Sequence, residues 1–430
     1  MATNTLTITP VRSIAGAMPV PGDKSISHRY VLLASIASGR TTLTGLAPGA
    51  DVASSCECVR RLGVPVERID PAGVVIDGRG WTGFQGAREP LDAGNSGTSM
   101  RLLAGLVAGR PFRTILIGDA SLSRRPMRRV LDPLAAMGAR VFDTAGHAPI
   151  TIDGGPLAGL HWQSPVASAQ VKSAIMLAGL SASGATSVTE PLRTRDHTER
   201  AFPAFGLACE VNALTILVAG GQQATAPASP LHVPGDPSSA AVWAAAAAGL
   251  PGGSIRIDGV CLNPRRLGFV RVLERMGARV TTEVQTMVAG EPVGTLHVAH
   301  GGHAAAVIAP DEVPDLVDEL PVLAARAALG GSLEVSGAAE LRVKESDRIA
   351  ALVAGLRRLG VNADERPDGF LVDGSARPRG GTAHAAADHR LVMAFALVGL
   401  GASGPSTIED AGAVAVSYPA FTRDLARLST

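Results

Sequence analysis

Apolar residues recur along the chain in two alternating patterns, and together these patterns predict a repeated α/β fold. An Ala- and Leu-rich helical segment, followed by a Gly-containing turn and a β-branched strand, appears six times, as in LLAGLVAGRPFRTILIG and AAAAAGLPGGSIRIDG. The copies follow one another at intervals of about seventy residues. They begin near Lys24, Ser96, Ser168, Pro237, Leu316 and His389. The pattern therefore predicts six α/β units, three in each of two domains.

Between these segments lies a second repeated element, a short helix that stops at Gly and leads into a strand, as in VLERMGARVTTE. The final copy, PAFTRDLARL, has no following strand, whereas the chain opens with a lone strand at Thr5–Thr9 that no helix precedes. We expect this N-terminal strand to complete the last unit. The pattern leaves open whether helices or sheets lie inside, and it excludes a Rossmann fold because no Gly-x-Gly-x-x-Gly follows a strand.

Composition restricts the function to local sites on a globular protein. The 430 residues are 46% hydrophobic and 18% charged, and 39 basic residues nearly balance 38 acidic ones, so no global field attracts nucleic acid or membrane. Aromatic residues at 3% argue against base-stacking surfaces. We expect no signal peptide and no membrane span, and the four cysteines fit reduced thiols rather than zinc ligands, which favours the cytoplasm. These cysteines are Cys56, Cys58, Cys209 and Cys261.

Two copies of one turn, PGDKSISHR at Pro21–Arg29 and PGDPSSAAV at Pro234–Val242, provide an internal comparison. Both place Asp where it caps a helix. The second copy continues with Pro237, a common first helical residue, whereas the first has Lys24 there and Arg29 further along. Cations near a helix N-terminus oppose the helix dipole unless an anion binds them. Solvated surface charge is the alternative; the contrast between the copies favours an anion site.

Other segments place hydrogen-bonding and charged groups near helix starts. LDAGNSGTSMR (Leu91–Arg101) is a loop that suits phosphate but is also an ordinary turn. SLSRRPMRRV (Ser121–Val130) clusters four arginines, which fit a small anion better than RNA. SAQVKS (Ser168–Ser173) and RTRDHTER (Arg193–Arg200) open helices, and in the second Arg195 is the best candidate for an anion contact, while His197 fits a structural role.

Three acidic segments complete the set. VDELP places Asp318 and Glu319 ahead of a helix, where acids normally stabilise the dipole. RVKESDRIAAL (Arg342–Leu352) is helical by pattern and puts Lys344 and Arg348 on one face, with Glu345 one position away; a salt-bridged surface helix has the same pattern. DHR, at positions 388–390, opens the last long helix. Together the segments indicate a cleft that binds two anions and moves protons.

The motifs PGDKSISHR, LDAGNSGTSMR and RVKESDRI, with SAQVKSA, TRDHTE, VDELP and DHR in the same order, resemble those of the 5-enolpyruvylshikimate-3-phosphate (EPSP) synthases, in their second sequence class. The resemblance covers nearly the whole chain. It implies the six-repeat enolpyruvyl transferase fold with an active site in the interdomain cleft. One domain would comprise residues 1–21 with 234–430, and the other residues 22–233. The implied activity transfers the enolpyruvyl group of phosphoenolpyruvate to the 5-hydroxyl of shikimate 3-phosphate, a step of chorismate and aromatic amino acid biosynthesis.

The resemblance also implies roles for individual residues. Asp318 would take the proton from the acceptor hydroxyl, Glu345 would deliver a proton to C3 of phosphoenolpyruvate, and Lys24 would complete the catalytic set. Shikimate 3-phosphate would be bound by Lys24, Ser25, Arg29, Ser168, Ala169, Gln170, Arg195, Asp318 and Lys344. Phosphoenolpyruvate would be bound by Lys24, Asn95, Gly97, Arg125, Gln170, Glu345, Arg348, His389 and Arg390.

The resemblance implies no metal and no organic cofactor, no nucleic-acid partner, and a monomer. Gly97 leaves room for the inhibitor glyphosate, so we expect inhibition. Three positions depart from common family patterns: Ala169 replaces a Ser, Thr194 replaces a Tyr, and Val416 stands where many members have Lys.

Two other functions fit part of the sequence pattern. An enolpyruvyl transferase acting on UDP-N-acetylglucosamine shares the fold plan but uses a loop cysteine, whereas Cys56 and Cys58 lie in a helical pattern. A phosphate-binding or RNA-associated repeat protein would explain the arginines but not Asp318 and Glu345 among them.

Overall fold

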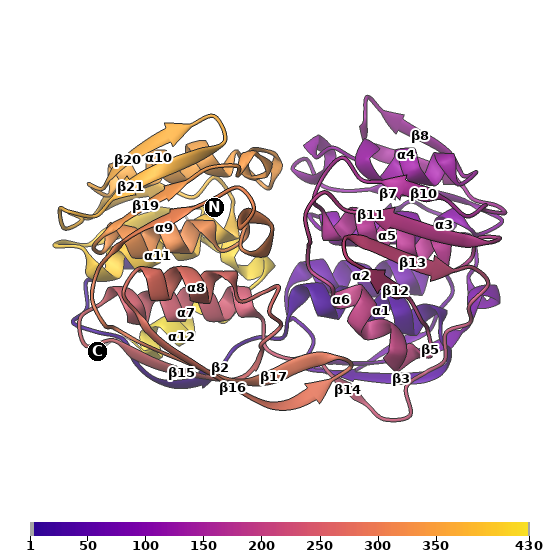
Figure 1. The fold of residues 1–430 in the computed structure, drawn as a ribbon, viewed down its shortest axis with the longest axis horizontal. Coiled ribbons are helices and arrows are strands. Elements are labelled where there is room, and N and C mark those ends of the chain that lie inside the picture. The colour runs from indigo at the N-terminus through magenta and orange to yellow at the C-terminus, as the bar shows by residue number, and fades with distance from the viewer. Residues whose placement is uncertain (1–3, 429–430) are drawn as a thin grey trace. The chain divides into compact units, whose positions relative to one another are not determined.

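A computed structural model describes residues 4–428 of the chain. Its backbone contacts divide the chain into two compact units (Figure 1). Unit 1 comprises the described residues up to Pro21, Pro234–Thr286 and those from Pro292 on, and unit 2 comprises Gly22–Val233 with Met287–Glu291. We propose that these units are the two domains expected from the sequence, with 287–291 reassigned.

Unit 2 is built around three helices that are buried along nearly their whole length. These inner helices are α1 (Lys24–Ile36), α3 (Gly97–Ala108) and α5 (Ala169–Gly179). Shorter helices lie beside them: α2 (Ala50–Arg61), α4 (Arg128–Ala136) and α6 (His197–Ala201). Helices α3 and α5 approach so closely that a Cβ on Gly105 would lie 2.2 Å from the carbonyl oxygen of Ala174, so only glycine fits there.

Three four-stranded sheets cover these helices, and all have the same topology: a parallel pair followed by antiparallel neighbours. The first sheet is β14 (Leu231–His232), β3 (Ser38–Thr44), β5 (Gly73–Arg79) and β4 (Val66–Asp70). The second is β6 (Leu91–Asp92), β7 (Arg113–Ile117), β9 (His147–Asp153) and β8 (Arg140–Thr144). The third is β10 (His161–Gln163), β11 (Ala185–Thr189), β13 (Thr215–Ala219) and β12 (Glu210–Asn212).

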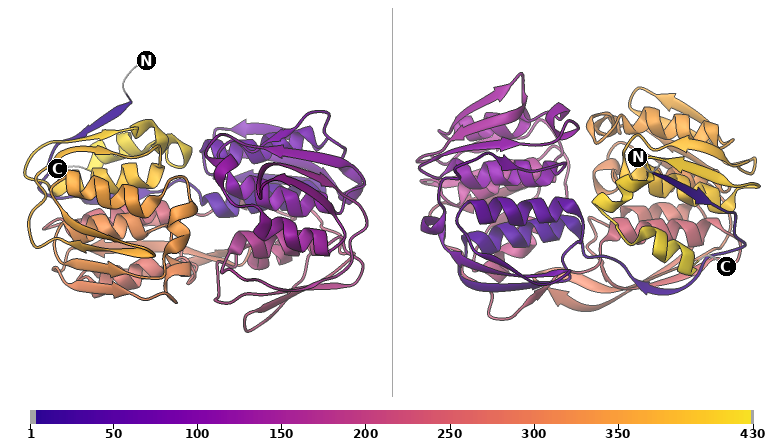
Figure 2. Two further views of the ribbon diagram at one scale, coloured as in Figure 1. Left: turned by 90° about the horizontal axis from the view of Figure 1, so that it is seen from above. Right: turned by 180° about the vertical axis from the view of Figure 1, so that it is seen from behind.

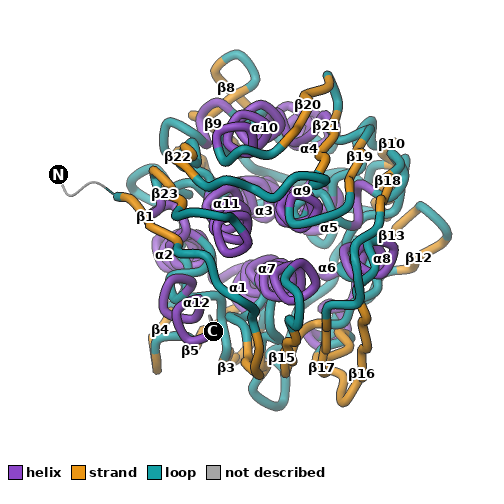
Figure 3. Tube along the Cα trace, turned by 90° about the vertical axis from the view of Figure 1, so that its left-hand side faces the viewer, coloured by secondary structure: helices purple, strands orange, loops and turns teal. Residues whose placement is uncertain are grey.

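Unit 1 repeats this plan, and Figure 3 shows its inner helices surrounded by strands. The inner helices are α7 (Pro237–Gly249), α9 (Leu320–Ala328) and α11 (His389–Gly401). The helices beside them are α8 (Gly268–Arg275), α10 (Arg348–Arg358) and α12 (Phe421–Leu428). All thirteen residues of α7 are buried, which its run of small alanines permits. Helices therefore lie inside and sheets outside, the choice that the sequence left open.

The sheets of unit 1 confirm the predicted role of the N-terminal strand. Two sheets have four strands: β16 (Arg279–Val288), β17 (Glu291–Ala299), β15 (Ser254–Cys261) and β2 (Ala15–Pro19); and β18 (Ala305–Ile308), β19 (Ser332–Val335), β21 (Gly369–Asp373) and β20 (Asn362–Arg366). The third has three: β1 (Thr5–Ile8), β23 (Ser406–Glu409) and β22 (Gly381–His384). Strand β1 pairs antiparallel with β23 and lies beside the C-terminal segment in both views of Figure 2.

One predicted helix was wrong in its position. The segment 342–352 does not form one helix, because α10 begins only at Arg348 and a short 3₁₀ turn, Ala339–Val343, precedes it. The carboxylate of Asp347 accepts a hydrogen bond from the amide of Ala350 and so caps α10. Lys344 and Glu345 consequently lie in the connection before the helix, not on its face. Among the described residues, no helix is long and apolar enough to cross a bilayer.

Candidate active site

The N-terminus of α1 holds a lysine beside an acid from the neighbouring helix. Asp23 caps α1 by accepting from the amide of Ile26 at 2.9 Å, which confirms the predicted cap. Lys24 is the first helical residue, and its Nζ lies 3.0 Å from Oδ2 of Asp51 on α2. The unfavourable position of this cation is therefore offset within the protein by a residue that the sequence did not single out. Lys24 remains partly exposed, at 19%.

Arg29 lies one turn deeper and is buried. Its Nε donates to Thr198 on α6 at 2.7 Å, and its Nη2 donates to Ser173 on α5 at 2.9 Å. Its Nη1 donates to the carbonyl oxygen of Ser25 at 2.9 Å. Burial lowers the pKa of Arg29 to about 10, against the attraction of Glu199. The guanidinium thus stays charged at neutral pH and is held by two inner helices and one short helix.

The loop before α3 brings two guanidinium groups around Gly97. Asn95 accepts from Nη2 of Arg125 at 2.6 Å. Arg101 donates to the amide oxygen of Gln170, and the Gln170 amide donates to Thr98. A Cβ on Gly97 would lie 3.1 Å from Nη1 of Arg101 and 3.4 Å from Nη1 of Arg125. Of the four clustered arginines, Arg125 is the buried one, whereas Arg124 and Arg128 are exposed.

The starts of α5 and α6 contribute the remaining residues of this group. Ser168 caps α5 through its hydroxyl, and Ala169 and Gln170 follow as the first two helical residues. Arg195 precedes α6 and lies near enough to Arg29 to lower its pKa by repulsion. We call Lys24, Arg29, Arg101, Arg125 and Arg195 the cationic cluster of unit 2. The sequence pattern assigns Arg101 no role of its own. Its position four residues after Gly97 on a predicted helix places the two on one face, which would have indicated that Arg101 lies near Gly97.

Unit 1 contains a second set, in which acids surround one buried arginine. Arg348 is 1% exposed; its Nε lies 2.7 Å from Oδ2 of Asp388, its Nη2 pairs with Glu345, and its Nη1 lies 3.7 Å from Oδ1 of Asp318. Arg390 donates to the Asp318 carbonyl at 2.9 Å and lies 3.7 Å from its carboxylate. We call these five residues, with Lys344, the Arg348 cluster.

The electrostatics of the Arg348 cluster keep its central guanidinium charged. Burial acts against the charge of Arg348, but Asp388 and Glu345 outweigh it and raise the pKa of its guanidinium. Burial lowers the pKa of Lys344, against the attraction of Asp318 and Glu340. The structure thus brings together Asp318, Lys344, Glu345, Arg348 and Arg390, five of the residues singled out in the sequence. His389 is also buried, as the first residue of α11.

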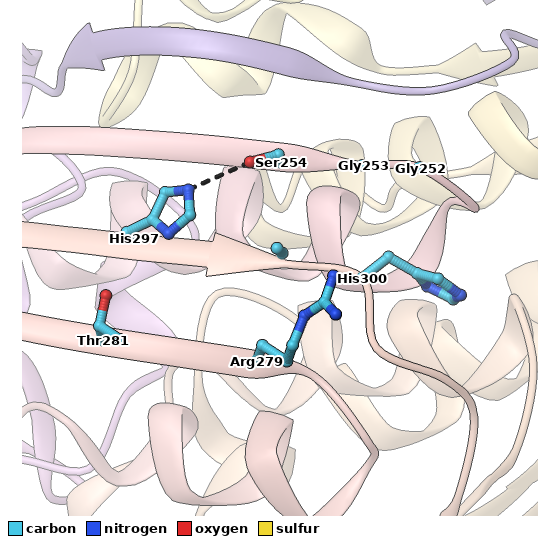
Figure 4. A pocket seen from close by; sticks show the side chains of 8 residues that line it. Gly252, Gly253, Ser254, Arg279, Thr281, His297 and His300 are labelled. Carbon is cyan, nitrogen blue, oxygen red and sulfur yellow. Dashed lines mark hydrogen bonds between the residues drawn. The ribbon is translucent and has the colours of Figure 1, made fainter.

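Other features of unit 1 lie apart from these residues. A pocket on the sheet β16-β17-β15-β2 is lined by eight residues, among them Ser254, Arg279, His297 and His300 (Figure 4). It contains none of the residues singled out in the sequence. Val416 ends an uncharged 3₁₀ segment, Ala411–Val416. Within residues 4–428, no group of three or more His, Cys, Asp or Glu side chains is arranged to hold a metal ion.

Comparisons with known proteins agree on one family. The family described as EPSP synthase (3-phosphoshikimate 1-carboxyvinyltransferase) matches residues 8–425. A 3-phosphoshikimate 1-carboxyvinyltransferase from Lactiplantibacillus plantarum is 46% identical over 427 residues, which cover 99% of this chain and 98% of that protein. The enzyme of the same description from Halorhodospira halophila is 47% identical over 424 residues, covering 98% and 95%.

Solved structures support the same family and fold. The EPSP synthase of Acinetobacter baumannii is 40% identical and superposes with a TM-score of 0.88, covering 99% of this chain and 98% of that one. The enolpyruvyl transferase NikO of Streptomyces tendae matches over the same shares with a TM-score of 0.78 but only 19% identity. The second likeness concerns the fold alone, and it confirms the predicted enolpyruvyl transferase fold.

Proposed function

Because the chain belongs to the EPSP synthase family, we propose that the cationic cluster and the Arg348 cluster serve one reaction. The reaction transfers the enolpyruvyl group of phosphoenolpyruvate to the 5-hydroxyl of shikimate 3-phosphate and releases inorganic phosphate, as in the synthesis of chorismate and the aromatic amino acids. The activity is that of a 3-phosphoshikimate 1-carboxyvinyltransferase. The observation that carries it is the 46% identity to an enzyme of this description over 99% of the chain.

The cationic cluster suits the fixed negative charges of the two substrates. We assign Arg29 to the carboxylate of shikimate 3-phosphate and Arg195, with Ser168, to its phosphate. Arg125, Gln170 and the loop at Gly97 would take the phosphate of phosphoenolpyruvate, and Lys24 would lie between the substrates. Guanidinium groups held by neighbouring hydrogen bonds orient such anions without paying for their own ordering. The bonds that fix Arg29 and Arg125 support this assignment.

The Arg348 cluster supplies the proton chemistry in this proposal. Protonation of phosphoenolpyruvate at C3 creates cationic character at C2, where the acceptor oxygen adds. The bond from C2 to phosphate then breaks while the C3 methyl group returns a proton to its donor, which restores the carbon–carbon double bond. Glu345 would deliver the C3 proton, and Asp318 would accept the proton of the 5-hydroxyl. Arg348 and Arg390 would bind the carboxylate of phosphoenolpyruvate. Two carboxylates near each other and near cations can hold different protonation states, as an acid and a base require.

The thiols argue against an enolpyruvyl transferase that depends on a reactive loop cysteine. Cys56 and Cys58 lie within α2 and are buried. Burial raises the pKa of the Cys56 thiol to about 11 and that of the Cys58 thiol to about 12. Both thiols therefore stay protonated at neutral pH and are poor nucleophiles.

Phosphate release tests the function directly. The purified chain should release phosphate from phosphoenolpyruvate when shikimate 3-phosphate is present, and only at background rate with UDP-N-acetylglucosamine or with no acceptor. Release with the nucleotide sugar instead would assign the rival activity. No phosphate release with either acceptor would contradict the proposed function, although the fold would be unaffected.

Gly97 provides a second prediction, on inhibition. We expect glyphosate to compete with phosphoenolpyruvate. We expect Gly97→Ala to weaken glyphosate binding by about 10- to 100-fold, because the new methyl group would occupy the space beside Arg101 and Arg125. Inhibition constants of the two proteins check this. Gly155→Ala is the matched control, since a Cβ there meets nothing within 4 Å. Equal glyphosate affinity in the wild type and Gly97→Ala would refute the account.

We further infer from the family that the protein acts in the cytoplasm as a monomer. Sedimentation of the purified chain tests the second of these expectations, because a mass close to 43.8 kDa is required.

A further inference from the structure

Lysine is rare in this chain, and two of its three lysines belong to the two charged clusters of the candidate site. Of the 39 basic residues, three are lysines and the rest are arginines. Lys24 belongs to the cationic cluster and Lys344 to the Arg348 cluster. The third, Lys172, was assigned no role by the sequence. An ammonium is a compact point charge that a guanidinium does not replace in a small buried site, so a buried lysine in this arginine-rich chain points to a specific use.

Lys172 sits between two buried carboxylates. Its Nζ lies 2.9 Å from Oε2 of Glu190 and 2.7 Å from Oε1 of Glu199. The three side chains are 3%, 3% and 7% exposed. Burial lowers the pKa of Lys172, but Glu199 and Glu190 outweigh that effect and raise it, so the ammonium is charged. One ammonium and two carboxylates give this group a net charge of −1.

Each member of this group adjoins or contacts a residue next to one of the two arginines proposed to bind the acceptor. Lys172 on α5 precedes Ser173, and Glu199 on α6 follows Thr198; these two hydroxyls accept the hydrogen bonds of Arg29. On the other side, Thr194 donates to Glu190 and precedes Arg195 in the chain. The ammonium therefore ties α5 to α6 beside the two hydroxyls that hold Arg29.

Glu199 is the link between Lys172 and Arg29. Of all acids, Glu199 acts most strongly on the charge of Arg29. Its Oε1 is held by Lys172, while its Oε2 is buried without a hydrogen-bond partner among the described residues. If the ammonium were absent, nothing would offset the attraction between Glu199 and Arg29, and an ion pair between them would compete with any incoming anion.

We propose that Lys172 is a positioning residue that holds Glu199 and so keeps the Arg29 guanidinium available for the carboxylate of the acceptor. The inference rests on the proposed function, in which Arg29 binds that carboxylate. It predicts that Lys172 controls the affinity for shikimate 3-phosphate and leaves phosphoenolpyruvate largely unaffected, although Lys172 touches neither substrate in this assignment.

Three variants test it by steady-state kinetics, with each substrate varied in turn. Lys172→Met should raise KM for shikimate 3-phosphate by about 10- to 100-fold and change KM for phosphoenolpyruvate by less than about threefold. The double variant Lys172→Met with Glu199→Gln should recover about tenfold or more of the lost acceptor affinity, because the competing carboxylate is neutralised. Glu199→Gln alone should leave acceptor KM unchanged or lower.

Arg366→Met removes the cation of an exposed ion pair with Glu334 and should alter neither KM. An equal rise in both KM values, or no recovery in the double variant, would show a merely structural role. If Lys172→Met does not fold, Glu199→Gln decides, since an acceptor KM raised more than about tenfold would overturn the proposal. An inactive wild type would contradict the proposed function itself, before any variant is compared.

Discussion

Replacing Glu345 with glutamine is expected to lower kcat for phosphate release by about 10²- to 10⁴-fold, the range typical of a lost general acid. The amide has nearly the same size and can still accept from Arg348, with which Glu345 is paired, so the surrounding contacts should survive. It cannot deliver a proton to C3 of phosphoenolpyruvate. Asp318→Asn should cause a loss of similar size at the other end of the reaction, because the amide cannot take the proton of the acceptor hydroxyl.

Measuring phosphate release at saturating concentrations of both substrates checks this prediction. The KM values should change much less than kcat. Glu334→Gln is a matched control, because it neutralises an acid in an exposed ion pair with Arg366 in the same unit. If Glu345→Gln kept activity within about threefold of the wild type, Glu345 would have no role in proton transfer, since a positioned acid contributes about 10²-fold or more.

Replacing Arg348 with methionine should reduce the free energy of unfolding by about 3–5 kcal/mol, the usual effect of removing one partner from a buried ion pair. Arg348 is 1% exposed and Asp388 is fully buried, at 2.7 Å. Asp388 also caps α11 by accepting from the amide of Arg390, a contact that the variant keeps, so the loss comes from the unpaired buried charge. Activity should fall further than stability explains, because Arg348 is also assigned to the carboxylate of phosphoenolpyruvate.

Urea unfolding of the wild type and the variant measures this effect. The double variant Arg348→Met with Asp388→Asn should regain part of the stability, because it removes the unpaired charge, but none of the activity. A loss below about 1 kcal/mol for Arg348→Met would mean that the Asp388 carboxylate is solvated or protonated instead of paired.

The fold was predictable from the sequence because its signals are local. The inner helices are rich in small and aliphatic residues, and the short helices of the first five units each lead to a Gly. The caps at Asp23 and Asp236 follow from a repeated turn. The role of the N-terminal strand followed from counting, since one unit lacked a strand and one strand lacked a unit. The failure at 342–352 has a local cause too: charges spaced four apart resemble a salt-bridged helix, but Asp347 caps a helix that begins later.

Much of the candidate site was not predictable, because it is made by contacts between repeats. Asp51 reaches Lys24 across 27 residues, and Gln170 reaches Arg101 across 69. Neither partner belongs to the motif that it completes. The same holds for the group around Lys172, whose two carboxylates come from β11's end and from α6. Sequence patterns identify residues on one element, whereas pairing between elements depends on register and packing over long separations.

The pairing of β1 with β23 has a consequence for the order in which the protein is made. Thr5 lies opposite Glu409, so about 400 residues must be synthesised before the first strand meets its partner. At about 5–20 residues per second, that wait lasts roughly 20–80 s. Nearly all of unit 2 is one continuous stretch, Gly22–Val233, and it leaves the ribosome long before the last sheet of unit 1 can close. We expect unit 2 to fold first, while the strand at the N-terminus stays unpaired until synthesis is almost complete.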